Sequence, residues 1–583
     1  MQSVDLTTLT AACSELRSQW LPARLEQVYQ RDRYTISLAL RTLKRRGWLD
    51  ISWHPQAARV CIADPPPRKP DTFTFSDQLR HQLGGLALVA LTAVSPWERV
   101  LDLQFAKRPG DPVLWHLYVE IMSKYSNVIL TETDQLVVTV AHQVSAQQSS
   151  VRPIQTSQPY ELPPSLTDPI PSLDESYERW QERVSLIPGA LSRQLLKNYR
   201  GLSSPLLNEM IQAAGLDPNQ STDSLTDEDW KRLFDCWKTW LISLENEKFK
   251  PHWTAKGYGV IAWENLSKEA IETSPETVNQ LLNIYYNQEL NQQLFKQIHH
   301  QIRQKLNNLL KKLRQKAAGF QQRLQQSDDA DLYRSYADIL MASLQQWQPG
   351  MKSITLSDFD TGEPIKISLD PEKNAVQNAQ AYYKRHQKLK RARVAVEPLL
   401  AEVMEEVNYL EQVEAAIEQI ETYRQPEDLQ TLEEIREELI QQNYLKIAEY
   451  RGSSQDAKTE FYHYQTPSKF EVLVGRNNRQ NDLLTSKIAG DYDLWFHTQE
   501  IPGSHVLLRL NAGEVPEDTD LQFVANLTAY YSRARQSEQV PVIYTRPKYV
   551  YKPKGAKPGM VIYKQETVIW GNPQQAEVGQ VKD

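Results

Sequence analysis

Two apolar stripes with coiled-coil spacing constrain the fold more than any other feature of the chain. Both recur at steps of mostly three or four residues, which places each stripe along one face of a long α-helix. The first helix is predicted from about residue 276 to 326, and its stripe comprises Leu294, Ile298, Ile302, Leu306, Leu309, Leu313, Phe320 and Leu324. The second is predicted from about 374 to 424, and its stripe comprises Val396, Leu399, Val403, Val407, Leu410, Val413, Ile417 and Ile420. Together they predict an antiparallel coiled-coil arm.

The segment between the two helices, MKSITLSDFDTGEPIKISLDP at 351–371, alternates apolar and polar residues around a glycine turn. This pattern predicts a small β-hairpin. We therefore assign residues 251–450 to the arm, with a β insert at about 330–370. Pro398 lies within the second helix, and we expect it either to kink that helix or to mark a restart.

Charge is strongly segregated along the predicted arm. Eight basic residues and no acid occur from Lys296 to Arg323, whereas glutamate is dense from 397 to 438. The whole chain has a net charge of −7, so any surface for a polyanion must arise locally. Two interpretations stay open, a solvated helix face or contact with RNA phosphates. The second basic stretch, YYKRHQKLKRAR, supplies the RNA candidates Lys384, Arg385, Lys388, Lys390 and Arg391.

Residues 1–172 combine short strands with helices. Alternation and β-branched content predict strands in RYTISLALRT, GWLDISWHP, ARVCIA and QLVVTVAHQV. Helical periodicity predicts helices at LTTLTAACSELRSQW (6–20) and DPVLWHLYVEIMSKY (111–125). The proline-rich passage QPYELPPSLTDPIPSL then marks a linker.

Residues 173–250 read as a compact helical domain. SLIPGALSRQLLKNYRGLSSPLLNEMIQAAGL predicts two short helices around a glycine turn. Such a unit is either a helix-hairpin-helix motif, which grips a nucleic-acid backbone through N–H groups of the turn, or a plain αα-hairpin. The pattern leaves both alternatives open.

The last region, 451–583, reads as an α+β domain. Strands are predicted in KFEVLVGRN, DLWFHT, HVLLRL, VPVIYT and GMVIYK, and a helix in DLQFVANLTAYYSRARQSE. Near its end, YTRPKYVYKPKGAKPGMVIYK interleaves bases with tyrosines, a pattern suited to phosphate contact and base stacking. The basic candidates there are Lys552, Lys554 and Lys557.

The stretch DLWFHTQEIPGSHVLLRL brings an acid, two imidazoles and a hydroxyl close together in the sequence. A catalytic triad would need Ser504 beside an imidazole, but Ser504 lies in PGSH rather than in a GxSxG elbow. On a strand, Asp493, Trp495 and His497 share one face, which favours a binding surface over catalysis. The candidates for such a surface, which would bind RNA, are Asp493, Trp495, His497, Ser504 and His505.

Several classes of functional site are not expected, because the sequence motifs that mark them are missing. His497 and His505 lack a zinc spacing, and the cysteines Cys13, Cys61 and Cys236 form no CxxC, so no metal is expected. No P-loop or GxGxxG occurs, which argues against a nucleotide cofactor. Without a signal peptide or an apolar run of about 18 residues, we expect a cytoplasmic protein that does not span a membrane.

Taken together, the separated motifs resemble the NFACT family. VGRNNRQNDLLTSKIAGDYDLWFHTQEIPGSHVLLRL resembles its NFACT-R domain, and YVYKPKGAKPGMVIY resembles the end of that domain. ISLDPEKNAVQNAQAYYKRHQKLKRA resembles the base of the family's coiled coil. WERVLDLQF, EIMSKYSNVIL and VRPIQTSQPYELPP resemble parts of its N-terminal domain.

The resemblance implies an α+β multidomain fold. A glycosylase-like α/β NFACT-N domain would occupy 1–172, a helix-hairpin-helix domain 173–250, the coiled-coil arm 251–450, and the RNA-binding NFACT-R domain 451–583.

It also implies a function in ribosome-associated quality control. Such a protein would bind the large ribosomal subunit carrying peptidyl-tRNA, contact ribosomal RNA, recruit tRNA, that for alanine in particular, and promote mRNA-independent C-terminal tailing of stalled chains. Ribosomal RNA would transfer the peptide, so the protein would have no enzymatic activity of its own and no cofactor. The resemblance also implies a monomer on the ribosome.

By resemblance, the tRNA-binding residues are Glu98, Arg99, Glu120, Ile121 and Met122. Arg99 would contact tRNA phosphate, and Glu98 would orient it. This chain has Glu98 where the family usually has Asp, and Ser157 stands near the place of a family Gly, so local geometry could differ at both. Ile121 and Met122 fit an ordinary helix core equally well.

Two alternatives belong to other classes of function. The family's older name suggests a fibronectin-binding adhesin, for which the absence of a signal peptide implies a secondary role at best. Likeness to formamidopyrimidine DNA glycosylases suggests a nucleic-acid enzyme. Those enzymes use an N-terminal proline amine and commonly a zinc finger, whereas here Gln2 follows Met1 and the thiolates are absent.

Overall fold

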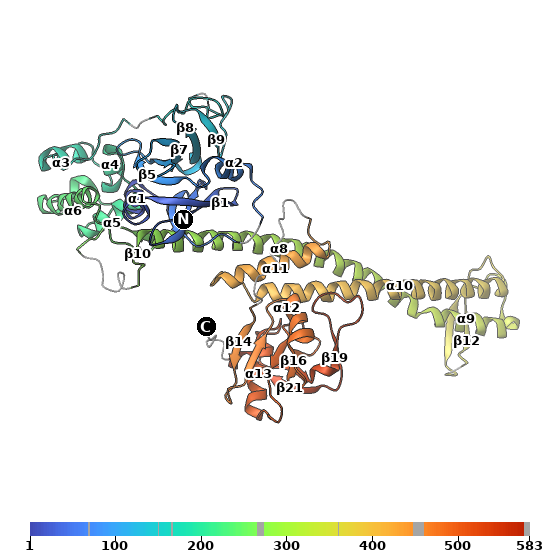
Figure 1. Ribbon diagram of the computed structural model, residues 1–583. Coiled ribbons are helices and arrows are strands. Elements are labelled where there is room, and N and C mark those ends of the chain that lie inside the picture. Colours follow the sequence, from blue (N-terminus) through green and yellow to red (C-terminus); the bar gives the residue numbers. More distant parts are fainter. Residues whose placement is uncertain are drawn as a thin grey trace. The chain divides into compact units, whose positions relative to one another are not determined.

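The computed structural model describes residues 1–67, 70–149, 151–164, 167–264, 273–359, 361–446 and 460–576, in two compact units (Figure 1). The first unit is Met1–Asn291 and the second is Gln292–Asp583. Helix α8 (Val278–Asp328) begins in the first unit and continues in the second. The predicted boundary between residues 450 and 451 lies outside the described residues.

A nine-stranded antiparallel sheet forms the centre of the first unit, in the order β4-β3-β2-β1-β5-β6-β7-β8-β9. Its strands are β1 (Ala23–Asp32), β2 (Thr35–Arg41), β3 (Arg46–Ser52), β4 (Arg59–Ala63), β5 (Ala87–Ala93), β6 (Val100–Ala106), β7 (Val113–Glu120), β8 (Asn127–Glu132) and β9 (Val137–Val140). Helices α1 (Leu6–Trp20) and α2 (Thr74–Leu83) pack against strands of this sheet. The helix predicted at 6–20 is therefore confirmed, and Asp5 caps it by accepting a 2.8 Å hydrogen bond from the Thr8 amide.

The helix predicted at 111–125 is wrong, because this segment forms strand β7 and a short 3-10 turn, Ser123–Tyr125. Both faces of β7 are buried near its end. Leu117 and Val119 join the main core, whereas Tyr118 packs into a separate apolar cluster. A strand covered on both faces carries apolar residues without strict alternation, and such a run can mimic helical periodicity.

Helices α3 to α6 come next along the described chain, and the two short helices predicted around a glycine turn are present as α4 and α5. The helices are α3 (Tyr177–Ser185), α4 (Leu191–Asn198), α5 (Ser204–Ala213) and α6 (Asp227–Glu245). Their shared core contains the buried indoles of Trp180, Trp230, Trp237 and Trp240. A small hairpin, β10 (His252–Thr254) and β11 (Gly257–Gly259), leads towards α8.

The arm in the second unit pairs α8 with α10 (Ala375–Glu418) and adds α11 (Pro426–Gln441). Most of both predicted stripes lies in this core, so the coiled-coil prediction is confirmed in outline. Leu294 and Leu399 are exposed, however, and Phe295 takes the buried place beside Leu294. Pro398 lies inside the continuous helix α10, so a restart there is excluded.

The predicted hairpin between the long helices is confirmed as β12 (Ser353–Ser357) and β13 (Pro364–Ser368), with Gly362 in a left-handed conformation (φ 73°). It packs with α9 (Ala330–Ala342) and the start of α10 around Ile339, Ile354 and Ile367.

The C-terminal domain contains a six-stranded sheet in the order β14-β15-β17-β16-β18-β21. Its strands are β14 (Tyr462–Gln465), β15 (Glu471–Val474), β16 (Leu494–Thr498), β17 (Val506–Leu508), β18 (Val540–Thr545) and β21 (Thr567–Gly571). Besides short π and 3-10 turns, the domain also contains α12 (Asn478–Leu483), α13 (Asp518–Tyr530), β19 (Val550–Tyr551) and β20 (Ile562–Tyr563). Four of the predicted strands are confirmed as β15, β16, β17 and β18, and GMVIYK contributes only the two residues of β20, which pair with β19 in a separate sheet. The helix predicted in DLQFVANLTAYYSRARQSE is confirmed only as far as Tyr530. Strands β14, β19 and β21 were not predicted.

Candidate functional site

Glu98 and Arg99 lie in the short loop that joins β5 to β6. The loop is closed by a 3.0 Å hydrogen bond from the Val94 amide to the Val100 carbonyl. Trp97 within it has a left-handed backbone (φ 62°) and packs edge-on against the buried Trp240, with ring centroids 5.7 Å apart. A residue with such a strained backbone keeps this conformation only where its surroundings hold it. The loop therefore presents the next two residues in a defined geometry.

The second predicted segment lies beside this loop. Val100 of β6 pairs with Glu120 of β7, and one step further the Ile121 amide donates a 2.9 Å hydrogen bond to the Arg99 carbonyl. The Arg99 guanidinium donates from Nη1 to the Val4 carbonyl at 3.2 Å. Ile121 is buried in the core and Met122 is half-buried. The structure thus brings the two segments together, although on a strand end rather than on a helix.

Glu120 is enclosed, with 1% of its surface exposed. Its carboxylate accepts hydrogen bonds from both terminal nitrogens of Arg152, at 3.0 and 2.5 Å, and from the Tyr160 hydroxyl at 2.9 Å. Tyr160 stacks on Tyr118 with ring centroids 4.1 Å apart. Glu120 therefore holds in place the segment after β9 that contains Arg152 and Tyr160, called here the exit passage. Because its carboxylate is buried, Glu120 would position the neighbouring strand end and not contact a ligand itself.

Burial and the Glu120 carboxylate together shift the pKa values of Arg152 and Tyr160. Burial, and then the neighbouring Glu120 carboxylate, raises the pKa of Tyr160. Burial opposes the charged form of Arg152, but its hydrogen bonds to Glu120 more than offset this and the pKa of Arg152 is raised. Arg152 and Tyr160 both lie in the motif VRPIQTSQPYELPP, although no role was predicted for either residue.

The turn between α4 and α5 reaches the same loop. Arg200 donates from Nη1 to the Glu98 carboxylate at 3.4 Å. Gly201 next to it is left-handed (φ 81°), and a Cβ built there would lie 2.5 Å from the Trp97 ring. Sequence reasoning identified the glycine turn but not its contact with the loop, because the contact joins residues about a hundred positions apart.

In the C-terminal domain, the five predicted surface residues are buried instead. Trp495 and His505 are 0% and 1% exposed, and even His497 is only 9% exposed. Asp493 accepts hydrogen bonds from the Gly490 and Leu510 amides at 2.8 and 2.9 Å, which ties the two strand ends together. The expectation that they present an open face is therefore corrected, because β16 and β17 are central strands covered on both sides.

The hydroxyl and imidazoles of this stretch are not arranged as a triad. Ser504 Oγ donates to Gln419 of the arm at 3.4 Å, and His505 Nδ1 instead lies 2.7 Å from Thr485 Oγ1. Burial lowers the pKa of His497 to about 4. Burial, followed by the nearby His497, holds the pKa of His505 well below its usual range. Both rings are therefore neutral packing groups at neutral pH.

The three predicted lysines of this domain differ in their surroundings. Lys552 pairs with Asp482 at 2.5 Å, and Lys554 is exposed. Lys557 lies over the rings of Tyr409 and Tyr444 of the arm, 4.8 and 5.0 Å from their centroids. Lys557 thus fastens the domain to the arm through cation–π contacts.

The basic stretch of α10 is open to solvent. Arg385 lies 4.2 Å over the ring of Tyr333. The five predicted cations there are all exposed, namely Lys384, Arg385, Lys388, Lys390 and Arg391. Their contact with RNA stays a prediction.

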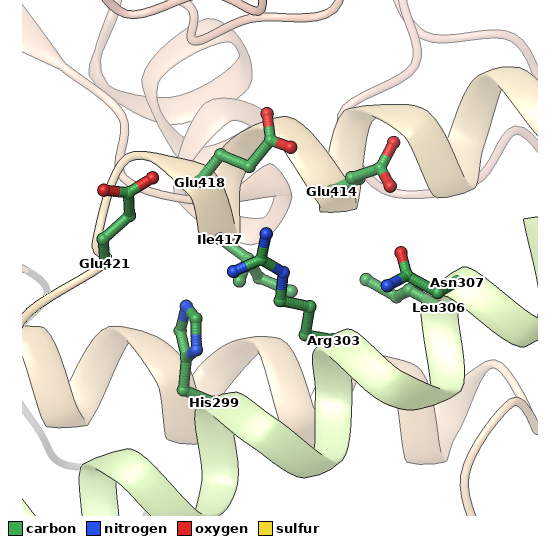
Figure 2. Close-up of a pocket in the computed structure, with 8 residues that line it drawn as sticks. All are labelled: His299, Arg303, Leu306, Asn307, Glu414, Ile417, Glu418 and Glu421. Atoms are coloured by element: carbon green, nitrogen blue, oxygen red, sulfur yellow. The ribbon is translucent and has the colours of Figure 1, made fainter.

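The basic block of α8 has a different environment. Figure 2 shows His299 and Arg303 of α8 facing Glu414, Glu418 and Glu421 across a hollow. Burial, and then the adjacent Glu418 carboxylate, raises the pKa of Glu414. Further along, Arg314 pairs with Glu411 at 2.6 Å. Part of the first basic block therefore neutralises the acidic stretch of the second helix within the arm.

Neither a metal cluster nor a membrane span is found in the described part of the chain. No three or more His, Cys, Asp or Glu side chains are grouped there as metal ligands. No helix in those ranges combines the length and apolar character needed to cross a membrane.

Residues 5–458 match the NFACT N-terminal and middle domains, and residues 460–565 match the NFACT protein RNA binding domain. The Rqc2 homolog RqcH of Bacillus subtilis strain 168 is 28% identical over 582 residues, covering 97% of each chain. A protein of the same name from Streptococcus suis is 29% identical over 579 residues, covering 98% of each chain. The solved C-terminal part of the fibronectin/fibrinogen-binding protein from Streptococcus suis is 30% identical, with 50% of this chain and 99% of that chain covered and a TM-score of 0.38.

Proposed function

The chain belongs to the NFACT family, and from this membership we propose that it is a ribosome quality control factor that binds RNA. The family assignment spans nearly the whole chain. The match of residues 460–565 to an RNA-binding domain supports the RNA partner directly.

The observation that carries the proposal of tRNA binding is the adjacency of the Arg99 loop and the Ile121 segment. A guanidinium has five N–H donors, and one nitrogen of Arg99 is used on the Val4 carbonyl. The remaining donors suit a phosphate oxygen pair of tRNA. Glu98 is one methylene longer than the family's Asp, and it reaches Arg200 across the site. Its role would be to hold the loop rather than to contact a base.

The finer part of the proposal concerns the substrate and the outcome. The protein would bind a large ribosomal subunit carrying peptidyl-tRNA, recruit tRNA for alanine, and promote mRNA-independent tailing of the stalled chain. Peptide transfer would belong to ribosomal RNA, so this chain would position substrates rather than react with them. It would do so as a single copy. The exposed cations of α10 are suited to ribosomal RNA phosphates.

Arg99→Ala tests the tRNA site. Recovery of tRNA with the tagged protein should fall at least tenfold, and RNA sequencing of the wild-type sample should show alanine tRNA enriched together with large-subunit RNA. Arg232→Ala is the matched control, because Arg232 pairs with Asp229 on the exposed face of α6. Equal tRNA recovery from the Arg99 variant and the control would contradict the proposal.

The tailing step has its own measurement. Mass spectrometry of stalled nascent chains should find untemplated C-terminal alanine in cells that hold the wild-type protein and much less in cells that hold Arg99→Ala. Tails of equal length and abundance in both would remove tailing from the proposal and leave RNA binding to be judged separately.

A further inference from the structure

A cationic surface lies on the nine-stranded sheet, at the end of β5 that is opposite the Arg99 loop. The loop follows Ala93, the last residue of β5. At the other end of β5, Ala87 pairs with Arg24 of β1, which in turn pairs with Arg41 of β2, and Arg41 pairs with Arg46 of β3. A strand rises about 3.3 Å per residue, so the seven residues of β5 separate the two ends by roughly 20 Å.

The three arginines form a row across three neighbouring strands. Residues directly opposite one another in antiparallel strands share a face, so Arg24, Arg41 and Arg46 lie side by side, and all three are exposed. Glu26 pairs with two of them, Arg41 at 3.3 Å and Arg46 at 2.8 Å. Like charges directly opposite one another destabilise a sheet. The single Glu26 carboxylate offsets only part of this repulsion among three arginines, and a bound polyanion would relieve the rest.

The turn between β2 and β3 extends the row with two more cations, Lys44 and Arg45. The Thr42 amide donates to the Arg45 carbonyl at 2.9 Å, and the Thr42 hydroxyl accepts from the Arg45 amide at 2.9 Å. Arg45 also donates to Gln19 of α1 at 2.5 Å. The turn is therefore fixed against α1, with Lys44 exposed.

Leu43 stands at the tip of this turn with its side chain fully exposed, at 106% of the reference surface. Next to the turn, Gly47 lies so close to α1 that a Cβ there would come within 2.4 Å of the Trp20 ring. This close approach holds the strand below the tip in place. A rigid tip that presents an apolar group between cations has the features of a binding element rather than of a loose loop.

We propose that this surface, the cationic ladder of Arg24, Arg41, Lys44, Arg45 and Arg46, binds the phosphate backbone of a helical RNA, at a place separate from the proposed tRNA site at Arg99. Guanidinium groups match phosphate geometry with paired donors. Leu43 would then lie against the sugars. An anionic membrane fits less well, because Leu43 is a single exposed apolar side chain at this tip and stable anchoring needs a larger apolar element. The inference goes beyond the proposed function and does not depend on it.

Charge reversal in the full-length protein tests the ladder. Arg24 and Lys44 form no ion pair within the described residues, so Arg24→Glu/Lys44→Glu should leave the fold intact. Binding of a duplex RNA of about 20 base pairs, followed by fluorescence anisotropy, should weaken at least tenfold. The slope of log Kd against log salt should fall by about 2, one for each lost phosphate contact. The matched control, Lys231→Glu/Lys248→Glu, changes two exposed lysines of the same unit and should stay within twofold of wild type. Equal loss in both variants would overturn the proposal.

A cross-linking experiment locates the contact. Cys13 and Cys61 are buried, so a Leu43→Cys variant that also carries Cys236→Ala can take a photoreactive maleimide at position 43 alone. An RNA adduct should form there from cell extract, should disappear with Arg24→Glu/Lys44→Glu, and should persist with Arg99→Ala. That persistence separates the ladder from the tRNA site. The proposal fails if RNA adducts at position 43 do not exceed those of a Lys231→Cys control, or if the probe reacts with phosphatidylglycerol vesicles and not with RNA.

Discussion

The backbone amide of Ile121 donates a 2.9 Å hydrogen bond to the carbonyl of Arg99. This bond continues the pairing of β6 with β7 past the last regular pair, Val100 with Glu120. Two motifs that are separate in the sequence are therefore one structural element. A change in the strand end should move the loop, and a change in the loop should move the strand end.

Breaking the buried pair of Glu120 and Arg152 should destabilise the first unit strongly. Arg152→Ala leaves a carboxylate with 1% exposure and no cation, a change that typically costs about 3–5 kcal/mol. The free energy of unfolding by urea measures this cost. Arg232→Ala removes an exposed pair and should cost no more than about 1 kcal/mol. Similar small costs for both would show that the buried pair does not hold the exit passage.

Gly201→Ala should weaken tRNA binding through the fold. The added Cβ meets the Trp97 ring at 2.5 Å and also has to adopt φ 81°, so the loop that carries Arg99 must shift. Gly215→Ala is the matched control, because Gly215 has a similar φ of 75° but open space around its Cβ. Both variants should lose about 1 kcal/mol from backbone strain. Only the Gly201 variant should lose tRNA affinity, measured by filter binding; a loss in both would assign the effect to strain alone.

Stability of the C-terminal domain should fall between pH 6.5 and pH 4. The pKa of His497 is lowered to about 4 in the folded protein. Between pH 6.5 and pH 4 the imidazole is therefore protonated in the unfolded chain but neutral in the folded protein, and this difference favours unfolding. The stabilisation is complete above the unfolded value near 6.5 and is lost as pH falls towards 4. At pH 5 the loss from His497 is on the order of 2 kcal/mol. Urea unfolding followed by tryptophan fluorescence at pH 7 and pH 5 measures it, and His497→Phe should reduce the pH dependence. An unchanged dependence in that variant would exclude His497 as its source.

Ser157→Gly should stabilise the protein. Ser157 has a left-handed backbone (φ 64°), a conformation that costs an L-residue free energy and that glycine adopts freely. The expected gain in thermal unfolding is about 0.5–1 kcal/mol, and Ser157→Val should lose more than that. This result would also explain why the family usually has glycine near this position. A destabilised Gly variant would mean that the serine side chain contributes more than the strain costs.

The helical parts of the fold could be predicted well because their signal is local. Ile298 and Ile302, or Val403 and Val407, recur at the helix period, so the stripes and the intervening hairpin follow from neighbouring residues alone. The misassigned Leu294 and Leu399 are exposed near the ends of the paired region. A straight helix drifts against a heptad pattern over such lengths, and only the partner decides which residue it buries.

For the predicted sites too, nearby residues revealed the motifs, whereas contacts with distant segments decided how the side chains are placed. The motifs around Arg99 and Ile121 were identified by likeness to a family, and their contact follows from strand pairing that no local pattern reveals. In the C-terminal domain, the alternation of Trp495 and His497 correctly placed them on one face of a strand. It did not show that this face is covered, because burial depends on Leu484 and Ile543 from distant segments.

The periodic elements, the segregation of charge along the arm and the order of the family motifs could all be predicted from the amino-acid sequence. These are properties of residues close together in the chain, and helix periodicity expresses them directly. Tertiary structure decided that β7 is a strand, that Glu120 is held by Arg152, and that Thr485 rather than Ser504 meets His505. Those outcomes depend on which remote segments exclude water from a side chain, and that is settled only when the sheets assemble.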